Sequence, residues 1–423
     1  MSYQLNLTRA HSVTAPRIDG GASSIRRMSP ATVASQLDCF AVTAPGLEPI
    51  CAGEVRSLGL DARVPRDGGG VSWRGDATSI ARANLWLRSA SRVVVRAARF
   101  RATAFYELEL QAKRIAWERF LPPGRTVALR VTCRKSKLYH SDAVAERFVE
   151  SIGRRVKGVV VDASSSADKG DEPDDEPLDA PDAKAARQLF VVRLVHDECT
   201  VSADSSGELL HRRGYRRALA KAPLRETLAA ALLLAADWKG DTPLVDPMCG
   251  SGTIPIEAAM LARRMAPGRA RSFAFERWPE HDARAWASIV DDARSGELPH
   301  SPVSIEGYDR DAGAITAAQA NAERAGVAAD VRWAVQPISA LAAAVGPGLV
   351  ATNPPYGVRV GEAGRLRDLY AQLGHVARRA RAGWDVALVS ANPTLERQTE
   401  LELSARVRTR NGGIPVRFMT GRT

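Results

Sequence analysis

Short apolar runs alternate with helix-like spacing over residues 38 to about 203. Apolar residues recur every three to four positions from Leu47 to Leu58 and Gly59 follows them, which predicts a helix over 47–58. The same reasoning predicts helices over 77–90 and 142–156, and strands over 39–43, 71–73, 92–101, 126–133 and 188–195. Short strands and helices in this mixed order indicate an α+β region.

After about residue 220 the pattern becomes a regular alternation of strand and helix. Strands are predicted over 243–247, 303–308, 331–335, 348–352 and 385–389, and helices over 224–236, 254–265, 311–325 and 366–379. Such alternation predicts an α/β Rossmann-like domain, a parallel sheet with helices on both faces. Ligands of these sheets bind beyond the carboxyl ends of the strands.

The first strand of this domain runs into the glycine-containing loop DPMCGSGT, residues 246–253. Gly250 and Gly252 would let the backbone pass close to a ligand, because a Cβ there would collide with it. The loop has neither the third glycine of the dinucleotide fingerprint nor the Lys of a P-loop. Asp246 favours a ligand with a cationic or amino-acid portion, and Asp309, at the end of the next strand, can accept from two ribose hydroxyls.

A second motif, Asn353-Pro354-Pro355-Tyr356-Gly357, directly follows the apolar strand 348–352. The Asn side-chain carbonyl and the Pro backbone carbonyls are rigidly held acceptors, and two of them can bind both hydrogens of a planar NH2 group. Hydrogen bonds aimed in this way free the conjugated lone pair of the amine toward an electrophile. Tyr356 can stack on the base that carries the amine. This chemistry works by positioning and electrostatics, so it requires no metal and no cysteine nucleophile.

Composition and charge narrow the class of protein. The chain has 423 residues, 45% of them apolar, and a net charge of +11 that comes from 51 Arg and 8 Lys against 48 acidic residues. Its longest apolar run, 228–236, is far too short for a membrane helix. Five isolated Cys argue against a disulfide framework or a cysteine zinc site, and the seven His lack metal-ligand spacing. We therefore expect a basic cytoplasmic protein that has no membrane segment, binds no metal and is a monomer.

Two segments look unstructured. Residues 1–36 are rich in Ser, Thr and Arg and predict a disordered tail, with a partial similarity to an organelle transit peptide. Residues 162–184 hold nine acidic residues and two Lys with almost no apolar side chain, which predicts an acidic disordered loop. A flap that competes with a polyanion for the basic surface is the functional alternative for this loop.

Taken together, the motifs resemble those of bacterial THUMP-domain RNA guanine-N2 methyltransferases, the 23S rRNA large-subunit enzymes and their tRNA relatives. The resemblance rests on FAVTAPGLEPICAGEV at 40–55, RKSKLYHSDAVAER at 134–147, HRRGYRRALAKAPLRETLAAALL at 211–233, DPMCGSGTIPIEAAM at 246–260, FAFERWPEHD at 273–282, NPPYG at 353–357 and NGGIPVR at 411–417. It implies a ferredoxin-like plus THUMP RNA-binding region over 37–203 and a class I methyltransferase domain over 204–423.

The same resemblance implies S-adenosylmethionine as cofactor and assigns residues around it. Its binding set is Asp246, Met248, Gly250, Gly252, Thr253 and Asp309, and the catalytic set that holds the guanine amino group is Asn353, Pro354, Pro355 and Tyr356. One departure concerns the adenine. Where relatives usually carry an acid after the third strand, this chain reads Val335-Gln336-Pro337-Ile338, so that contact is in doubt.

Basic residues interleaved with aromatic ones predict RNA contacts, by phosphate neutralisation and base stacking. The residues selected are Arg134, Lys135 and Lys137, which precede Tyr139, and Arg212, Arg213, Tyr215, Arg216 and Arg217, just before the methyltransferase domain. A solvated charged face is the alternative for such runs. Cys249, Trp278 and Trp286 are expected to pack locally, and Asn321 and Glu323 to lie on a helix surface.

The function predicted from the sequence is methyl transfer from S-adenosylmethionine to the 2-amino group of a guanine, with 23S rRNA favoured as partner and tRNA open. A protein-glutamine methyltransferase shares the Asn-Pro-Pro-Tyr chemistry and is the first alternative. A catalytically silent RNA-binding or assembly protein is the second, because of Pro337.

Overall fold

The computed structural model describes residues 36–162, 187–216, 224–356 and 363–423. The predicted N-terminal tail and acidic loop lie almost entirely outside the described residues, as do Arg217 and Gly357.

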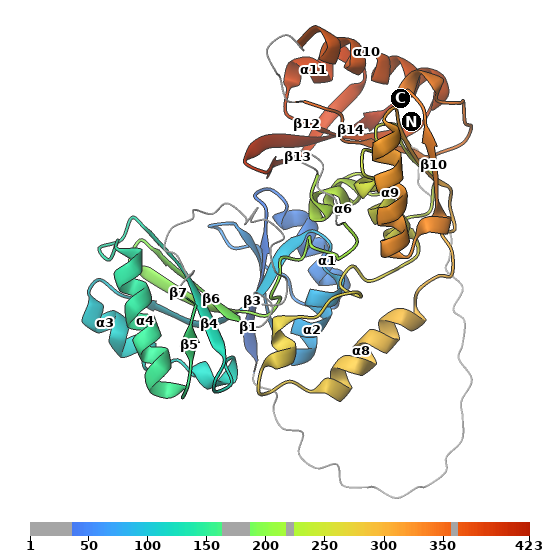
Figure 1. The fold of residues 1–423 in the computed structure, drawn as a ribbon. Coiled ribbons are helices and arrows are strands. Elements are labelled where there is room, and N and C mark those ends of the chain that lie inside the picture. Colours follow the sequence, from blue (N-terminus) through green and yellow to red (C-terminus); the bar gives the residue numbers. More distant parts are fainter. Residues whose placement is uncertain (1–35, 163–186, 217–223, 357–362) are drawn as a thin grey trace, which may run out of the picture. The chain divides into compact units, whose positions relative to one another are not determined.

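The first half of the chain folds around a mixed seven-stranded sheet of order β2-β1-β3-β7-β6-β4-β5 (Figure 1). Its elements are β1 (Leu37–Thr43), α1 (Glu48–Ser57), β2 (Gly70–Gly75), α2 (Ala77–Trp86), β3 (Ala90–Arg101), α3 (Phe105–Ala112), β4 (Thr126–Arg134), α4 (Ser141–Arg155), β5 (Val160–Val161), β6 (Gln188–Val195) and β7 (Glu198–Asp204). All the strands and helices predicted for this region are present, with ends shifted by a few residues. The α+β prediction is confirmed.

The sequence did not reveal β7 or α3. β6 and β7 form a hairpin through His196 and Asp197, which both have positive φ (51° and 64°). Two central residues of this kind match the twist of the flanking strands, but the usual Asn-Gly or Asp-Gly signature is missing here. The hairpin was therefore not recognisable from its turn residues.

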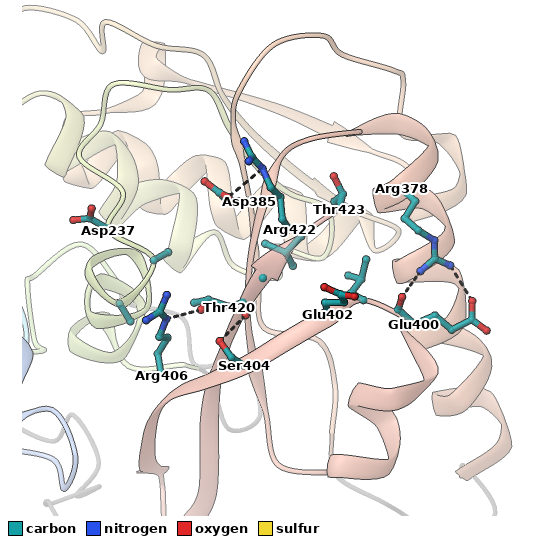
Figure 2. Close-up of a pocket in the computed structure, with 15 residues that line it drawn as sticks. Asp237, Arg378, Asp385, Glu400, Glu402, Ser404, Arg406, Thr420, Arg422 and Thr423 are labelled. Atoms are coloured by element: carbon teal, nitrogen blue, oxygen red, sulfur yellow. Dashed lines mark hydrogen bonds and ion pairs between the residues drawn. The ribbon is translucent and has the colours of Figure 1, made fainter. Parts of the chain in front are cut away.

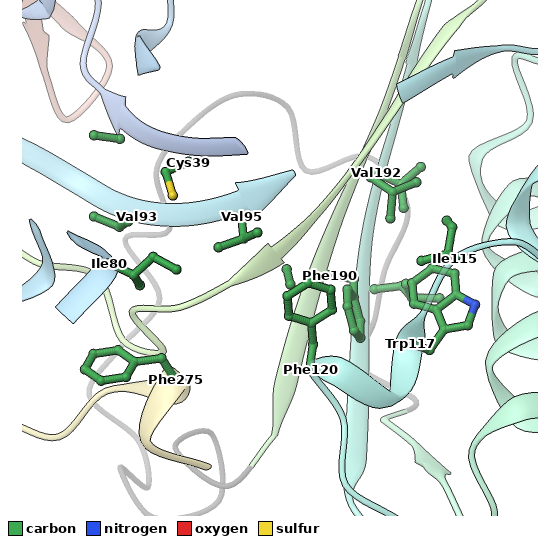
Figure 3. Close-up of a cluster of buried hydrophobic side chains, with 14 of the residues drawn as sticks. Cys39, Ile80, Val93, Val95, Ile115, Trp117, Phe120, Phe190, Val192 and Phe275 are labelled. Carbon is green, nitrogen blue, oxygen red and sulfur yellow. The ribbon is translucent and has the colours of Figure 1, made fainter. Parts of the chain in front are cut away.

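The core beneath this sheet contains aromatic residues from both halves of the chain (Figure 3). Trp117 packs edge-on against Phe190, with ring centroids 5.0 Å apart. Phe275, which follows the first helices of the second half, joins the same core, and Trp278 packs edge-on against Phe120 at 5.1 Å. The expected local packing of Trp278 thus involves the first half of the chain.

The second half folds around a seven-stranded sheet of order β10-β9-β8-β11-β12-β14-β13, in which the first five strands are parallel. Its strands are β8 (Leu244–Asp246), β9 (Ile305–Asp309), β10 (Val331–Val335), β11 (Leu349–Thr352), β12 (Asp385–Ser390), β13 (Glu402–Asn411) and β14 (Ile414–Arg422). Its helices are α6 (Glu226–Ala235), α7 (Thr253–Ala262), α8 (Ala283–Ser295), α9 (Ala312–Ala325), α10 (Ala363–Ala380) and α11 (Pro393–Gln398). The predicted parallel sheet is confirmed, and β13 and β14 add an antiparallel hairpin.

β8 is the middle one of the five parallel strands and pairs with β9 on one side and β11 on the other. The chain therefore runs outward from β8 to β9 and β10, and then returns to the other side of β8 with β11. Such a reversal in strand order opens a crevice at the carboxyl ends of the central strands. Asp246, Asp309 and Asn353 all stand at those ends.

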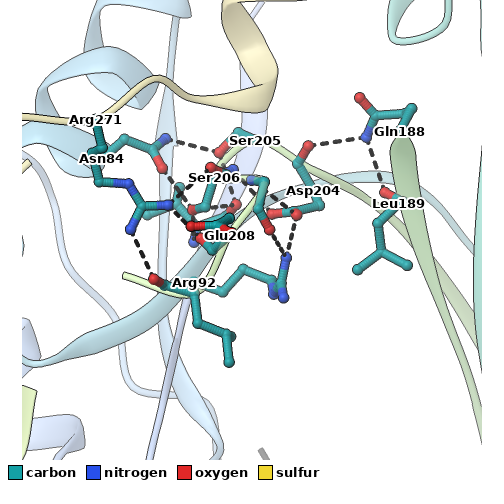
Figure 4. A network of polar contacts seen from close by, with 12 residues as sticks. Asn84, Arg92, Gln188, Leu189, Asp204, Ser205, Ser206, Glu208 and Arg271 are labelled. Atoms are coloured by element: carbon teal, nitrogen blue, oxygen red, sulfur yellow. Dashed lines mark hydrogen bonds and ion pairs between the residues drawn. The ribbon is translucent and has the colours of Figure 1, made fainter. Parts of the chain in front are cut away.

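A buried polar network stands where the first half ends (Figure 4). Arg92 pairs with Asp204 and donates to Gly207 O at 2.8 Å, and the Asp204 carboxylate also accepts from Ser206 N at 2.9 Å. Burial raises the pKa of Asp204, and the Arg92 charge opposes that rise. Arg271, from the segment after α7, donates to Leu209 O at 2.7 Å. This network ties the end of β7 to the second half of the chain.

Candidate active site

Asp246 ends β8 with its side chain buried. Its Oδ1 accepts from Met248 N at 3.1 Å. Burial raises the pKa of Asp246 to about 7, the neighbouring charge of Asp309 adds to that rise, and the Met248 N–H opposes it. A buried carboxylate of this kind gains from a cation placed beside it, because the cation offsets the cost of its burial.

The loop Met248–Gly252, called the cofactor loop below, spans the ends of β8 and β9. Cys249 N donates to Tyr308 O at 2.8 Å, and Gly250 N donates to Asp309 Oδ2 at 2.9 Å. Thr253 is buried at the start of α7. Cys249 is buried, and burial raises the pKa of its thiol well above the ordinary range. The thiol therefore stays protonated, in line with its expected packing role.

The two glycines of the cofactor loop serve different purposes. Gly250 has φ +52°, and a Cβ built there would meet no protein atom within 4 Å, so this position borders open space. Gly252 has φ +84°, and a Cβ there would stand 2.7 Å from the Trp333 ring and 2.9 Å from Ala318 Cβ. Only Gly250 fits the predicted approach to a ligand. At Gly252 the missing side chain instead makes room for Trp333.

Asp309 ends β9 with one backbone donor on each carboxylate oxygen. Its Oδ1 accepts from Asp311 N at 3.0 Å and its Oδ2 from Gly250 N at 2.9 Å. Each oxygen keeps a further lone pair, so the carboxylate can still accept two hydroxyls. At the end of β10 the chain continues with Gln336, whose N–H donates to Asp309 O at 2.9 Å, and no carboxylate stands there.

Asn321 supports the cofactor loop, and this contact was not predicted from the sequence. It was predicted to lie on a helix surface, but it is fully buried on α9 and its Nδ2 donates to Ser251 O at 2.9 Å. A signal was present in the sequence. Ile315, Ala318 and Ala322 are the buried apolar residues of α9, and Asn321 shares their helical spacing.

The Asn353–Tyr356 segment leaves the carboxyl end of β11. Pro354 is buried and Pro355 is exposed. Asn353 Oδ1 is a buried acceptor without a hydrogen-bond partner among the described residues. The Tyr356 hydroxyl accepts from Asn411 Nδ2 at 2.9 Å, and burial raises the pKa of that hydroxyl. Buried acceptors are normally satisfied, so this oxygen, which has no partner within the described ranges, leaves room for a further donor at the crevice.

The residues predicted to contact RNA fall into two groups. Arg134, Lys135 and Lys137 are exposed where β4 ends, and Tyr139 close by is 67% exposed. These side chains form an accessible surface that combines positive charge with an aromatic ring.

In the second group the described side chains do not form an open basic surface, and Arg217 lies outside the described residues. Arg213 and Tyr215 are only 3% and 2% exposed. Arg213 donates to Arg88 O at 2.7 Å, and the Tyr215 hydroxyl donates to Glu257 at 3.1 Å. Arg212 pairs with Glu208 and Arg216 with Glu226, at 3.6 and 2.8 Å. This run looked like a solvated basic surface, but it joins the two halves of the chain, where its charges meet carboxylates and carbonyls.

A broad groove of about 1030 Å³ lies elsewhere on the second sheet (Figure 2). Asp385 at the start of β12 and Arg422 at the end of β14 line it, together with Glu402 and Arg406. It lies at the amino end of the parallel strands and carries both signs of charge. The candidate site therefore remains at the opposite edge, where the strand-end residues converge.

In the described ranges no three or more His, Cys, Asp or Glu side chains are grouped to hold a metal ion. No helix in them is long and apolar enough to span a membrane.

The parallel sheet centred on β8, its antiparallel final hairpin, and the acidic and Asn-Pro-Pro-Tyr strand ends define the class of Rossmann-like methyltransferases. Three family models match the chain: an RlmL ferredoxin-like domain at residues 38–94, a THUMP domain at 102–166, and an RMKL-like methyltransferase domain at 213–419. These matches confirm the two-part organisation expected from the motifs.

Individual relatives agree with the family models. The chain is 34% identical to a putative RNA methyltransferase of Synechocystis, over 89% of this chain and 94% of that protein. It is 38% identical to ribosomal RNA large subunit methyltransferase K/L of Syntrophotalea carbinolica, over 90% of this chain but only 53% of that protein. The chain thus spans about half the length of this K/L relative.

Among solved structures, a putative methyltransferase named SMU.472, complexed with SAH, superposes with a TM-score of 0.78 at 29% identity, over 91% of this chain and 98% of that one. The chain belongs to the family of THUMP-domain RNA methyltransferases with an RMKL-like methyltransferase domain.

Proposed function

We propose that this chain transfers a methyl group from S-adenosylmethionine to the exocyclic 2-amino group of a guanine in structured RNA, with 23S rRNA as the favoured substrate. The observation that carries the proposal is the buried Oδ1 of Asn353, which no donor of the described residues reaches, next to the rigid Pro354-Pro355 backbone. An acceptor in this place requires a donor, and a planar NH2 group supplies two.

The other strand ends fit the methyl donor. Asp246 offers a buried carboxylate to a positively charged group, Asp309 keeps lone pairs for two ribose hydroxyls, and Gly250 borders open space. S-adenosylmethionine supplies an electrophilic methyl group on a sulfonium. The chain itself binds this donor, orients it toward Asn353 and keeps the two reacting atoms together.

The chain activates the amine by accepting its hydrogens. Asn353 Oδ1 accepts one N–H and the Pro354 carbonyl accepts the other, which turns the nitrogen lone pair out of conjugation with the ring. Bound S-adenosylmethionine would supply the methyl group to this lone pair, with the C–S bond breaking as the N–C bond forms, and the nitrogen would then release its proton to water. Tyr356, held by Asn411, provides an aromatic face for the extruded base.

The first half of the chain captures the substrate. Lys135, Lys137 and Tyr139 present charge and a stacking surface, which suits looped RNA because the bases of a regular RNA helix are hidden. A basic RNA-binding half favours RNA over a protein glutamine as the methyl acceptor. A silent RNA-binding protein would have no need of an unpaired Asn353 acceptor.

The test is mass spectrometry of nucleosides from 23S rRNA and tRNA of a strain that lacks the gene, complemented with wild type or with Asn353→Ala. We expect the N2-methylguanosine content of 23S rRNA to fall in the deletion strain and to return only with wild type. Loss from tRNA alone would assign the tRNA substrate. Unchanged RNA together with an unmethylated protein glutamine would refute the proposal.

A further inference from the structure

A buried series of polar contacts connects the first half of the chain to the cofactor loop. We propose that Asn321 is a positioning residue for the cofactor loop and that Arg324 and Tyr215 fix it to the joint between the two halves. The inference rests on the proposed binding of S-adenosylmethionine at this loop. Within the described ranges the hydrogen bonds of these three residues go to the loop and to the joint, so their role is to hold the loop.

The contact with the loop has a defined orientation. Asn321 Nδ2 donates to Ser251 O at 2.9 Å, and its Oδ1 accepts from Arg324 Nη2. A backbone carbonyl can only accept and a guanidinium can only donate, so these neighbours permit a single orientation of the amide. Ser251 lies between Gly250, whose N–H donates to Asp309 Oδ2, and Gly252, whose N–H donates to Cys249 O at 2.9 Å, so the Asn321 bond adds a restraint on the carbonyl between these two donors. Asn321 therefore restrains the part of the loop that borders open space.

Arg324 extends this restraint to the joint. It lies one turn beyond Asn321 on α9, and its Nε donates to Tyr215 O at 2.6 Å while its Nη2 reaches Asn321. The planar guanidinium holds both contacts in one fixed geometry. Arg324 is exposed, whereas Asn321 and Tyr215 are buried. It thus bridges two buried groups from the surface.

Tyr215 is in turn anchored to the helix that follows the loop. Its hydroxyl donates to Glu257 Oε1 at 3.1 Å on α7, and Arg213 Nε lies 3.5 Å from the same oxygen. Arg213 Nη2 donates to Arg88 O at 2.7 Å, and Arg88 Nη2 donates to Met265 O at 2.6 Å. The loop carbonyl and the helix behind the loop are therefore held by the same joint.

Burial explains why the series is rigid. Arg88, Arg213, Glu257 and Asn321 are all less than 9% exposed. Each contact would leave a buried polar group unpaired if it opened, which costs more than an exposed contact would. Because the contacts are in series, losing Arg324 should remove part of the ligand affinity that Asn321 contributes. Losing both should cost little more than losing Asn321 alone.

The experiment measures S-adenosylhomocysteine binding by calorimetry at a temperature where circular dichroism shows every variant folded. The variants are Asn321→Ala, Asn321→Asp, Arg324→Ala and the Asn321→Ala/Arg324→Ala double mutant. Glu323→Ala, at the exposed neighbouring position, is the matched control. We expect the dissociation constant to rise about tenfold for both Asn321 variants and about threefold for Arg324→Ala. The double mutant should match Asn321→Ala, the control should match wild type, and RNA affinity should stay within twofold throughout.

Asn321→Asp isolates the key contact, because it keeps the acceptor for Arg324 and loses the donor to Ser251 O. If Asn321→Ala fails to fold, this variant and Arg324→Ala still decide the question. Wild-type affinity in both would overturn the inference, and so would additive losses in the double mutant. If wild type binds no S-adenosylhomocysteine, the proposed cofactor is refuted. This outcome is seen in wild type alone, so it differs from a failure of the inference, which appears only when variants are compared with wild type.

Discussion

The side-chain amide of Asn411 donates to the hydroxyl of Tyr356 across 2.9 Å, and it thereby joins the tip of the β13–β14 hairpin to the Asn-Pro-Pro-Tyr segment. Asn411 is 6% exposed, so this bond is largely shielded from water. The bond sets the position of the one aromatic ring that the sequence places beside the acceptor Asn353. A residue 55 positions downstream of Tyr356 therefore helps to position this ring.

Removing this bond should impair transfer by misplacing the ring. We expect Asn411→Ala and Tyr356→Phe each to lower single-turnover methylation about tenfold, and the double mutant to be no slower than either, because both remove one shared contact. Tyr356→Ala should be slower still, since it removes the stacking face. Independent, multiplying losses for Asn411→Ala and Tyr356→Phe would contradict a shared role.

Asn353 should act on the chemical step alone. We expect Asn353→Ala to reduce kcat by at least about a hundredfold, as the loss of a preorganised acceptor does at other polar transition states. Binding of S-adenosylhomocysteine and of RNA should remain within twofold of wild type. Calorimetry and filter binding check these two affinities, and a kcat within threefold of wild type would remove Asn353 from the catalytic set.

The raised pKa of Asp246 predicts a pH-dependent stability. With a folded-state pKa of about 7 against an ordinary value of 3.8, the folded protein holds a proton that the unfolded chain releases. The free energy of unfolding should therefore fall as pH rises from about 4 to about 7, by at most roughly 4 kcal/mol for this group. Asp246→Asn has no ionisable group at this position, so it lacks this loss of unfolding free energy. It should be more stable than wild type at pH 8 and show no such advantage at pH 4.5 by urea unfolding.

Binding should respond to pH in the opposite sense. The ammonium of the amino-acid portion of S-adenosylhomocysteine requires the ionised carboxylate. The affinity of wild type for this ligand should therefore increase as pH rises through about 7. Asp246→Asn should bind weakly at every pH. An affinity that is flat between pH 6 and 8 in wild type would argue against contact between Asp246 and the ligand.

Substitutions at the two glycines of the cofactor loop should have different effects, one on ligand affinity and the other on stability. Gly250→Ala adds a methyl group into open space at the cost of a left-handed residue, about 1–2 kcal/mol, so it should fold and lose ligand affinity. Gly252→Ala adds the same backbone strain and a collision with Trp333 at 2.7 Å. It should lose clearly more thermal stability. Equal unfolding temperatures for the two variants would contradict this assignment.

The RNA surface should reside on the first half of the chain. Lys137→Glu should weaken RNA binding and reduce the slope of log affinity against log salt by about one. Lys239→Glu makes the same charge change at an exposed position of the second half, between α6 and β8, and serves as the control. Equal slopes for the two variants would exclude a phosphate contact at Lys137.

Periodicity predicted the parallel sheet well, because a buried strand between two amphipathic helices leaves a strong signal. Periodicity failed where a polar residue is buried because it forms hydrogen bonds with distant groups, since its own polarity predicts exposure. Arg213, Tyr215 and Asn321 look like surface residues in sequence, and only the carbonyls and carboxylates of distant segments pair them. The β13–β14 hairpin was missed for a related reason. Two of the three buried residues of β13, Thr409 and Asn411, are polar, so the strand shows little apolar alternation.

Phe275 and Trp278 follow α7 in the chain, yet they complete the aromatic core under the first sheet. A fragment cut after β7 would remove Trp278 from the ring of Phe120 and lose the Trp278 hydrogen bond to Gln188. The first half of the chain therefore cannot be transferred to another enzyme as an isolated domain unless Phe275 and Trp278 are included.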